Sequence, residues 1–397
     1  MISREMYLQR IKPYVNQKLI KVLTGQRRVG KTYVLQLVAE EIKNNSPDAN
    51  VIYIDKEKYE FDYMKSHTEL MAYINIHKTE GMNYVFIDEV QDIEGFEKVL
   101  RSLYNEDNFD LYCTGSNAKV FSSELATFLS GRQISFHIGS LSFKEFCLFH
   151  KVEPTNETLV KYLKMGGMPY LIHLPDDDKT RFEYLANIYS TILYRDVVNR
   201  HQIRDPRFLN DLLKYVADNI GNIFSANKIS VYLKNQKVNK NVALILDYLT
   251  YIEDAFFINK VQRTDIQGKR QFEIGEKYYF EDIGLRNSIL GYNQQDIGKI
   301  IENVVFLHLR NCKYDVTVGF SDNREIDFLA TKGGEKIYVQ VAYLLSDEIV
   351  VEREFGNLLK IKDNYPKYVV SFDSFSAPNT YSGIVHFTLK DFLLNFE

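Results

Sequence analysis

Short apolar runs alternate with helical patterns over the first third of the chain. Four runs rich in β-branched and aromatic residues predict strands, namely Leu19–Thr24, Asn50–Asp55, Tyr84–Asp88 and Asp110–Thr114. Between them, apolar residues recur with helical spacing in three segments, namely Thr32–Asn44, Thr68–Lys78 and Phe96–Glu106. Strands that alternate with helices form right-handed βαβ units, so this part of the chain predicts a parallel sheet covered by helices.

The middle of the chain, from about Glu153, carries little strand pattern. Apolar residues at i, i+3 and i+4 predict successive helices over Leu159–Leu163, Arg181–His201, Arg207–Asn219, Ser225–Leu233 and Asn239–Ile252. A predicted strand, Phe256–Arg263, follows them. Two short helices followed by a hairpin-like strand are the outline of a winged helix, so we expect a helical, winged-helix-like domain here.

The last third returns to a mixed pattern. Its order is α-β-β-β-α-β, over Gly298–Asn311, Tyr314–Phe320, Glu325–Thr331, Lys336–Tyr343, Ile349–Lys362 and Lys367–Phe372. Such an order predicts a compact α/β module. Upstream of it, Tyr278-Tyr279-Phe280 has the composition of a buried strand.

Composition narrows the classes of protein. A chain of 397 residues is long enough for two or three domains, and its 45% hydrophobic and 26% charged residues are those of a globular protein. A net charge of −4 excludes a uniformly basic nucleic-acid binder, although a local basic groove stays open. Three widely separated cysteines exclude a disulfide framework, and no cysteine or histidine spacing indicates zinc. With no signal peptide or apolar span, we expect a cytoplasmic protein with no membrane contact.

A glycine-rich loop joins the first predicted strand to the first predicted helix. The segment Gly25–Thr32, GQRRVGKT, matches G-x-x-x-x-G-K-[ST] in full. Its glycines let backbone N–H groups surround phosphate oxygens at a helix N-terminus. We expect Lys31 to reach the β and γ phosphates and the Thr32 hydroxyl to ligate Mg²⁺. The expected nucleotide contacts are Gly25, Gln26, Arg27, Arg28, Val29, Gly30, Lys31, Thr32 and Tyr33.

Two carboxylates, Asp88 and Glu89, stand at the end of the third predicted strand, in the segment Tyr84-Val-Phe-Ile-Asp88-Glu89. Ligands bind at the carboxyl ends of parallel strands, where the phosphate loop also lies. We expect Asp88 to hold Mg²⁺, directly or through a water, and Glu89 to polarise the attacking water. At the end of the following strand, Ser116 or Asn117 is expected to touch the γ-phosphate or that water. No N-K-x-D guanine signature follows, which favours ATP over GTP.

An arginine that completes the site is harder to place from sequence. Arg132, in Ser130-Gly131-Arg132, follows the third strand motif and is the first candidate. Arg195, in Tyr194-Arg195-Asp196, is the second. For both, the alternative is a surface or ion-pairing arginine.

These motifs together carry a family resemblance. GQRRVGKT, VFIDEVQDI, CTGSNA, SGRQISFHIGSLSFKEF and MGGMPYL, in this order, resemble the prokaryotic AAA-type ATPases. Within them, the chain resembles the group whose C-terminal half is a domain of unknown function with a nuclease-like fold. The resemblance covers nearly the whole chain. It implies an α/β ATPase domain with a P-loop and a parallel sheet (1–152), a helical winged-helix-like domain (153–265), and a domain similar to the PD-(D/E)xK nucleases, restriction-endonuclease-like in fold (266–397).

The nuclease-like domain departs from its pattern. Such nucleases need a helix Glu, a strand Asp, and a following strand with (D/E)-x-K, so that carboxylates bind Mg²⁺ and the lysine serves the attacking water. Glu302 and Asp327 match the first two positions, but the third motif reads Gln340-Val341-Ala342. Because a metal-ligand charge and the lysine are both lost, we expect the fold without the nuclease chemistry.

Three functions remain open from the sequence. The first is an Mg²⁺-dependent ATPase whose nucleotide state rearranges its domains, and this is the preferred hypothesis. The second is a non-hydrolysing, ATP-gated module that binds DNA or a protein through the middle and C-terminal domains. The third is an ATP-regulated nuclease. A homo-oligomer is compatible with all three.

Overall fold

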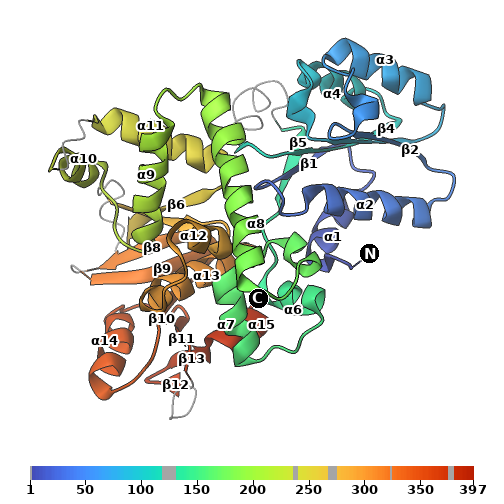
Figure 1. The fold of residues 1–397 in the computed structure, drawn as a ribbon. Helices are drawn as coiled ribbons and strands as arrows, with labels where there is room; N and C mark the ends of the chain where they lie inside the picture. The colour runs from blue at the N-terminus through green and yellow to red at the C-terminus, as the bar shows by residue number, and fades with distance from the viewer. Residues whose placement is uncertain (1, 119–130, 236–239, 267–274, 322–323, 374–379) are drawn as a thin grey trace. The chain divides into compact units, whose positions relative to one another are not determined.

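The computed structural model describes residues 2–118, 131–235, 240–266, 275–321, 324–373 and 380–397 (Figure 1). The chain groups into two compact units. Unit 1 comprises Met1–Gly139 with Asp254–Phe256, and unit 2 comprises Ser140–Glu253 with Phe257–Glu397. Most residues of the two predicted C-terminal domains lie in unit 2, and the division at residues 152 and 265 stays a prediction. No helix in the described ranges is long and apolar enough to cross a membrane.

Unit 1 is built on a parallel sheet, as the sequence predicted, and the sheet has five strands. The strands are β1 (Ile20–Thr24), β2 (Asn50–Asp55), β3 (Asn83–Asp88), β4 (Phe109–Gly115) and β5 (Gln133–His137). Their order is β2-β3-β4-β1-β5, and every neighbouring pair is parallel. The sequence pattern missed β5 because it is an edge strand in which only Phe136 is fully buried.

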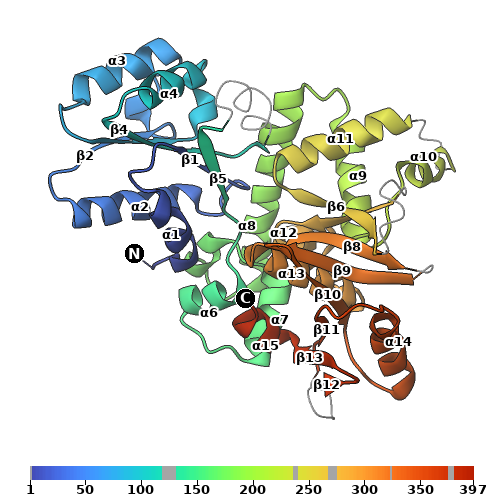
Figure 2. The ribbon, with the colours of Figure 1, turned by 180° about the vertical axis from the view of Figure 1, so that it is seen from behind.

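Helices cover both faces of this sheet. On one face lie α1 (Glu5–Ile11) and α2 (Lys31–Asn45), and on the other α3 (His67–His77) and α4 (Phe96–Tyr104), as Figures 1 and 2 show from opposite sides. Every residue of β1, β3 and β4 is buried. A strand covered on both faces needs a continuous apolar run rather than an alternating one, which explains the sequence of these strands.

Unit 2 contains an eight-stranded mixed sheet. Its order is β12-β13-β11-β10-β9-β8-β6-β7. The strands are β6 (Ile258–Asp265), β7 (Glu276–Phe280), β8 (Asp315–Ser321), β9 (Arg324–Lys332), β10 (Glu335–Ala342), β11 (Lys367–Ser371), β12 (Thr380–Tyr381) and β13 (Ile384–Thr388). The predicted order α-β-β-β-α-β is confirmed as α13 (Ile297–Asn311), β8, β9, β10, α14 (Glu348–Leu359) and β11.

Unit 2 contains eight further α-helices among the described residues. They are α6 (Phe143–His150), α7 (Asn156–Met165), α8 (Asp178–Thr191), α9 (Pro206–Asp218), α10 (Ala226–Asn235), α11 (Val242–Asp254), α12 (Ile283–Leu290) and α15 (Leu389–Asn395). Of these, α12 and α15 contact the sheet. A π-helix, Ile192–Asn199, continues α8. The predicted helix Arg181–His201 therefore spans two kinds of helix. The apolar spacing of the sequence shows no break there.

A buried ion pair fixes the amino end of the unit 1 sheet. Lys21 of β1 and Asp110 of β4 are both almost fully buried, and the Lys21 ammonium contacts Asp110 Oδ1. The other carboxylate oxygen, Oδ2, accepts hydrogen bonds from the Tyr112 hydroxyl at 2.8 Å and the Asn16 amide N–H at 2.9 Å. Burial lowers the pKa of Lys21, and Asp110 opposes that shift.

Replacing Asp110 tests how much this pair supports unit 1. Asp110→Ala leaves the Lys21 ammonium buried without its carboxylate, so we expect the free energy of unfolding to fall by about 3–5 kcal/mol in urea unfolding experiments. Asp107→Ala is the matched control, because it removes the carboxylate of an exposed pair with Lys18. The control should unfold like the wild type. Equal losses in both variants would contradict this account.

Candidate functional site

The phosphate-loop segment connects β1 to α2 and requires glycine at its first position. Gly25 has φ +144°, and a Cβ there would lie 2.1 Å from the backbone oxygen of Ile138. Gly30, with φ +95°, caps the N-terminus of α2. A side chain at Gly25 would clash with backbone that cannot yield, and a side chain at Gly30 would be strained. The loop therefore presents backbone N–H groups at a helix N-terminus.

Lys31 begins α2 and is almost fully buried. Its ammonium donates to the backbone oxygen of Gln26 at 3.1 Å and lies 3.5 Å from Glu89 Oε1. The loop lysine and the carboxylate that follows β3 thus form an ion pair. The sequence placed both residues in one site, and the structure brings them together.

Asp88 ends β3 and joins the loop helix to the sheet. Thr32 Oγ1 donates to Asp88 Oδ2 at 2.7 Å, and Thr114 Oγ1 donates to Asp88 Oδ1. Asp88 is fully buried. Burial raises the pKa of Asp88 to about 6, while the two threonine hydrogen bonds lower it. The sequence analysis missed Thr114, although its place at the end of the apolar run Asp110–Thr114 was a usable signal.

Glu89 has an unusual backbone conformation for a residue with a side chain. Its φ is +51°, in the left-handed region. Its carboxylate accepts hydrogen bonds from Ser116 Oγ at 3.1 Å and from the Gln91 amide, and its N–H donates to Thr114 Oγ1 at 2.8 Å. Burial raises the pKa of Glu89, but the charges of Lys31 and Arg27 outweigh burial and hold it below its usual value. The carboxylate is therefore ionised.

The other expected nucleotide contacts lie in different surroundings. Gln26 and Val29 are buried, and the side-chain amide of Gln26 has no hydrogen-bond partner among the residues described. Arg27 is buried and pairs with Glu57 at 3.5 Å. The Tyr33 hydroxyl donates to the backbone oxygen of Ile2 at 2.8 Å.

Two further loop and strand-end residues differ sharply in exposure. Arg28 is exposed and has φ +69°. Asn117 is buried directly after Ser116, at the end of β4. Of the two polar residues offered for this position, Ser116 is the one whose hydroxyl donates to Glu89.

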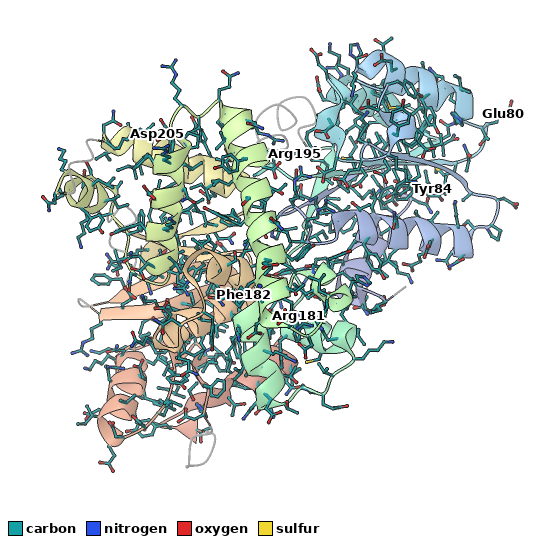
Figure 3. The ribbon with its side chains drawn as sticks, in the orientation of Figure 1. Glu80, Tyr84, Arg181, Phe182, Arg195 and Asp205 are labelled. Atoms are coloured by element: carbon teal, nitrogen blue, oxygen red, sulfur yellow. The ribbon has the colours of Figure 1, made fainter. Side chains whose placement is uncertain are left out.

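Of the two candidate arginines, Arg132 lies in unit 1 away from this cluster, and Arg195 belongs to unit 2. Arg132 precedes β5, its guanidinium lies over the Tyr104 ring at 5.2 Å, and its backbone oxygen accepts from Ile20 N at the start of β1. Five strand residues of about 3.3 Å each separate that end of β1 from the phosphate loop. Arg195 is exposed on the π-helix of unit 2, where Figure 3 labels it.

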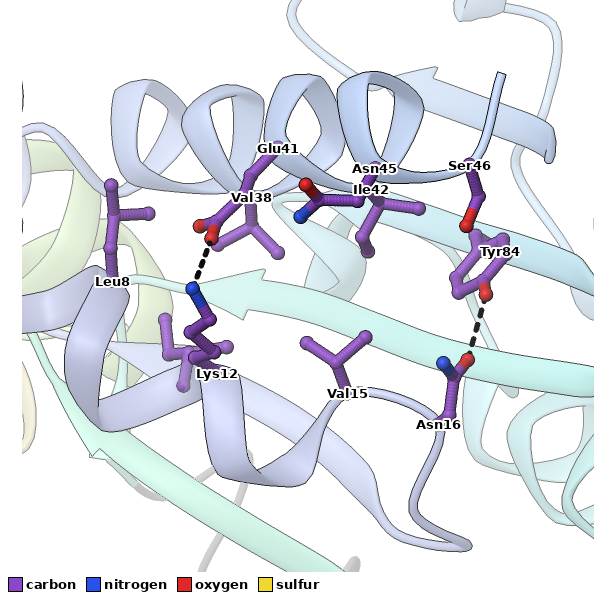
Figure 4. A pocket seen from close by; sticks show the side chains of 11 residues that line it. Leu8, Lys12, Val15, Asn16, Val38, Glu41, Ile42, Asn45, Ser46 and Tyr84 are labelled. Carbon is purple, nitrogen blue, oxygen red and sulfur yellow. Dashed lines mark hydrogen bonds and ion pairs between the residues drawn. The ribbon is translucent and has the colours of Figure 1, made fainter. Parts of the chain in front are cut away.

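A cavity in unit 1 lies away from these residues. It measures about 300 Å³ and is lined by α1 and the carboxyl-terminal half of α2, whereas the phosphate loop adjoins the other end of α2 (Figure 4). Two polar pairs line it, with Lys12 Nζ 3.2 Å from Glu41 Oε1 and the Tyr84 hydroxyl 2.7 Å from Asn16 Oδ1. Lys31, Thr32, Asp88 and Glu89 do not line this cavity.

The nuclease-like motif positions converge in unit 2, together with a lysine that the motif does not contain. Lys277 Nζ of β7 lies 2.8 Å from Glu302 Oε1 of α13 and 3.8 Å from Asp327 Oδ1 of β9. Burial lowers the pKa of Lys277, but the surrounding carboxylates outweigh burial and raise it. Burial and then Glu302 raise the pKa of Asp327 well above its usual value. Ala342 lies in an apolar cluster.

The raised pKa of Asp88 predicts a stability change with pH. An unfolded Asp titrates near about 3.9, so the folded protein binds this proton more tightly and the contribution of Asp88 to stability is lost as pH rises from about 4 to about 6. Relative to Asp88→Asn, the free energy of unfolding of the wild type should fall by up to about 3 kcal/mol across that window. Urea unfolding in EDTA, from pH 4 to 7.5, measures it.

Asp88→Asn also loses a threonine hydrogen bond, which lowers its free energy of unfolding by the same amount at every pH. The test therefore compares how the free energies of unfolding of the wild type and of Asp88→Asn change with pH, not their absolute values. Asp48→Asn, at an exposed position, should follow the wild-type curve. Parallel curves for the wild type and Asp88→Asn would show that Asp88 does not titrate in this range.

Similarity to known proteins agrees with this site. Residues 17–147 match the family described as an AAA domain, and residues 156–296 match a domain of unknown function, DUF8612. An uncharacterized protein of Haemophilus influenzae is 34% identical over 378 residues, covering 94% of this chain and 93% of that protein. One from Methanocaldococcus jannaschii is 34% identical over 362 residues, covering 87% of this chain and 79% of that protein.

Among solved structures, the Aeropyrum pernix ORC1 protein in complex with DNA is 10% identical and covers 73% of this chain and 92% of that one. The TM-score between the two structures is 0.34. The two sequence relatives are similar over most of their own lengths and most of this one. The chain therefore belongs to the same family as these Haemophilus and Methanocaldococcus proteins, and within it residues 17–147 are an AAA domain.

Proposed function

We propose that the protein binds ATP with Mg²⁺ and hydrolyses it, and that the nucleotide state drives rearrangement of its domains. The observation that carries the proposal is the meeting of Lys31, Thr32, Asp88 and Glu89 at one edge of a parallel sheet. Membership of an AAA-domain family supports ATP as the nucleotide.

Each residue has a distinct task in this proposal. Backbone N–H groups of Gly25–Gly30 and the N-terminus of α2 bind the phosphates, and Lys31 neutralises the charge that develops on the transferred phosphoryl group. Glu89, held as a carboxylate, orients the attacking water and accepts its proton. In this proposal the Asn117 amide contacts the γ-phosphate, and the Ser116 hydroxyl holds the Glu89 carboxylate, to which it donates a hydrogen bond.

The residues at the expected Mg²⁺ position fit that ion. Thr32 Oγ1 and Asp88 Oδ2 are oxygen donors 2.7 Å apart, and Mg²⁺ prefers oxygen ligands while keeping several waters. Bound with ATP, Mg²⁺ would neutralise phosphate charge. It would also favour the ionised form of Asp88. Without the ion, burial raises the pKa of Asp88 and so favours the protonated form.

The Lys31–Glu89 pair links nucleotide binding to the catalytic carboxylate. Phosphate oxygens would compete with Glu89 for the Lys31 ammonium, so we expect nucleotide binding to weaken the pair. Glu89 is then retained by Ser116 and Gln91.

Unit 2 supplies the partner-binding part of the proposal. Residues in the predicted middle domain form α9, α10 and α11, followed by the antiparallel pair β6–β7, and Phe224 pairs with Glu276 of β7. This order supports a winged-helix-like module that binds DNA or a protein client. We propose that ATP binding and hydrolysis alter its engagement with that partner.

Steady-state ATP hydrolysis with Mg²⁺ tests the proposal. Lys31→Ala should abolish both ATP binding and turnover, because the phosphate charge loses its counterion. Glu89→Gln should retain binding of a fluorescent ATP analogue and lose roughly 100-fold or more in turnover, because the neutral amide cannot accept the proton. Adding DNA to each reaction shows whether nucleic acid stimulates turnover.

Lys12→Ala is the matched control, since Lys12 lies in unit 1 and pairs with Glu41 beside the cavity. It should hydrolyse ATP like the wild type. Tight ATP binding without turnover in the wild type would replace the ATPase with a non-hydrolysing, nucleotide-gated module. Absence of both binding and turnover would reject both functions.

We further propose that Arg132 contributes to hydrolysis only across an interface between copies of the chain, since it lies at the opposite end of β1 from its own phosphate loop. Mixing Arg132→Ala with Lys31→Ala should then restore part of the turnover that each variant lacks alone. Full activity of Arg132→Ala by itself would remove Arg132 from the mechanism.

A further inference from the structure

A single buried ammonium stands at the centre of three carboxylates in unit 2. Lys277 is 1% exposed, and its Nζ lies 2.8 Å from Glu302, 2.6 Å from Glu325 and 3.8 Å from Asp327. The first two distances are those of charge-assisted hydrogen bonds. An ammonium has three protons, and these three carboxylates surround it.

Local geometry holds the cluster in place. Lys277 and Tyr279 are two residues apart on β7 and so share a face of the sheet, and the Tyr279 hydroxyl donates to Glu302 Oε1 at 2.5 Å. Glu325 and Asp327 share a face of β9 in the same way. Because alternate residues of a strand share a face, β7 and β9 direct these side chains to one point, where Glu302 of α13 meets them.

The polar atoms at the motif positions are also engaged by the protein itself. Asp327 Oδ2 accepts from the Val341 amide at 2.8 Å. The Gln340 amide donates to Glu354 Oε2 at 3.1 Å, and its oxygen accepts from the Asp327 amide at 3.4 Å. Gln340 thus binds α14 and β9.

These contacts do not fit the Mg²⁺ that the nuclease resemblance implies. Mg²⁺ needs oxygen ligands at about 2.0–2.1 Å in near-octahedral geometry. An ammonium that is hydrogen-bonded to Glu302 and lies 3.8 Å from Asp327 occupies the space between them and neutralises their charge, so it excludes the ion. Within the described ranges, no group of three or more His, Cys, Asp and Glu residues is arranged to hold a metal.

We propose that the Lys277 ammonium is a built-in cation that takes the place of a divalent metal between Glu302 and Asp327, which leaves this domain metal-independent and without metal-dependent nuclease activity. The cation required to hold Glu302, Glu325 and Asp327 together is supplied covalently by β7. Removing it uncovers a carboxylate site for a divalent metal. The inference concerns unit 2 alone and stands or falls independently of the ATPase proposal.

Manganese binding to the full chain tests this inference. All variants carry Asp88→Asn and are measured without nucleotide, so that the site in unit 1 contributes little metal binding. Titration with Mn²⁺, followed by electron paramagnetic resonance of the free ion, should show no bound Mn²⁺ that depends on Asp327 when Lys277 is present. Lys277→Ala should gain one Mn²⁺ site, and adding Asp327→Asn to it should remove that site.

Thermal unfolding supplies a second readout. In EDTA, Lys277→Ala should unfold at a lower temperature than the protein that retains Lys277, and Mn²⁺ should restore part of that loss. The protein that retains Lys277 should unfold at the same temperature in EDTA and in Mn²⁺. Lys260→Ala is the matched control, because Lys260 lies on the neighbouring strand and pairs with Glu276 at 2.6 Å in a partly exposed position. It should gain no Mn²⁺ site.

Two results would overturn the inference. In the first, the protein that retains Lys277 binds Mn²⁺ or cleaves DNA or RNA in a metal-dependent way, and Asp327→Asn abolishes that binding or cleavage. In the second, a folded Lys277→Ala gains no Mn²⁺ site. Lys277→Met, which keeps most of the side-chain length, replaces Lys277→Ala if the latter does not fold. If neither variant folds, Asp327-dependent Mn²⁺ binding or cleavage by the protein that retains Lys277 would still overturn the inference.

Discussion

The hydrogen bonds to one buried carboxylate connect the working parts of unit 1. Asp88 accepts from Thr32 of α2 and from Thr114 of β4, so the phosphate-loop helix, the strand with the acidic pair and the next strand meet at one side chain. Parallel strands end at the same edge of a sheet, and this shared edge makes the meeting possible. An antiparallel arrangement of the same strands would place these residues at opposite ends.

Much of unit 1 could be predicted from sequence because its determinants are local. The apolar runs that became β1 to β4 are short, continuous and bounded by polar residues, and the phosphate-loop spacing requires glycine where the backbone closely approaches Ile138. β5 escaped prediction because an edge strand does not need a continuous apolar run. Thr114 was missed because threonine is common at strand ends, so its place at the end of the run Asp110–Thr114 was a weak signal, and the structure adds the hydrogen bond to Asp88.

Unit 2 shows the limit of a motif defined by spacing. A search along the sequence looks for lysine two residues after Gln340 and finds Ala342, which packs in an apolar cluster. The positive charge enters the carboxylate cluster from Lys277, which precedes both Glu302 and Asp327 in the chain. Which strand supplies a charge depends on tertiary packing, and periodicity does not encode it. Only the structure shows that α13, β7 and β9 bring Glu302, Lys277 and Asp327 together.

The left-handed backbone of Glu89 has a consequence for how such a protein changes over time. A side chain at φ +51° costs the fold stability that glycine or asparagine would not. Glycine or asparagine at position 89 would relieve that strain but would leave the Lys31 ammonium buried without its carboxylate, which costs more stability than the strain does. Substitutions at positions 31 and 89 are therefore expected to arise together in descendants of this chain.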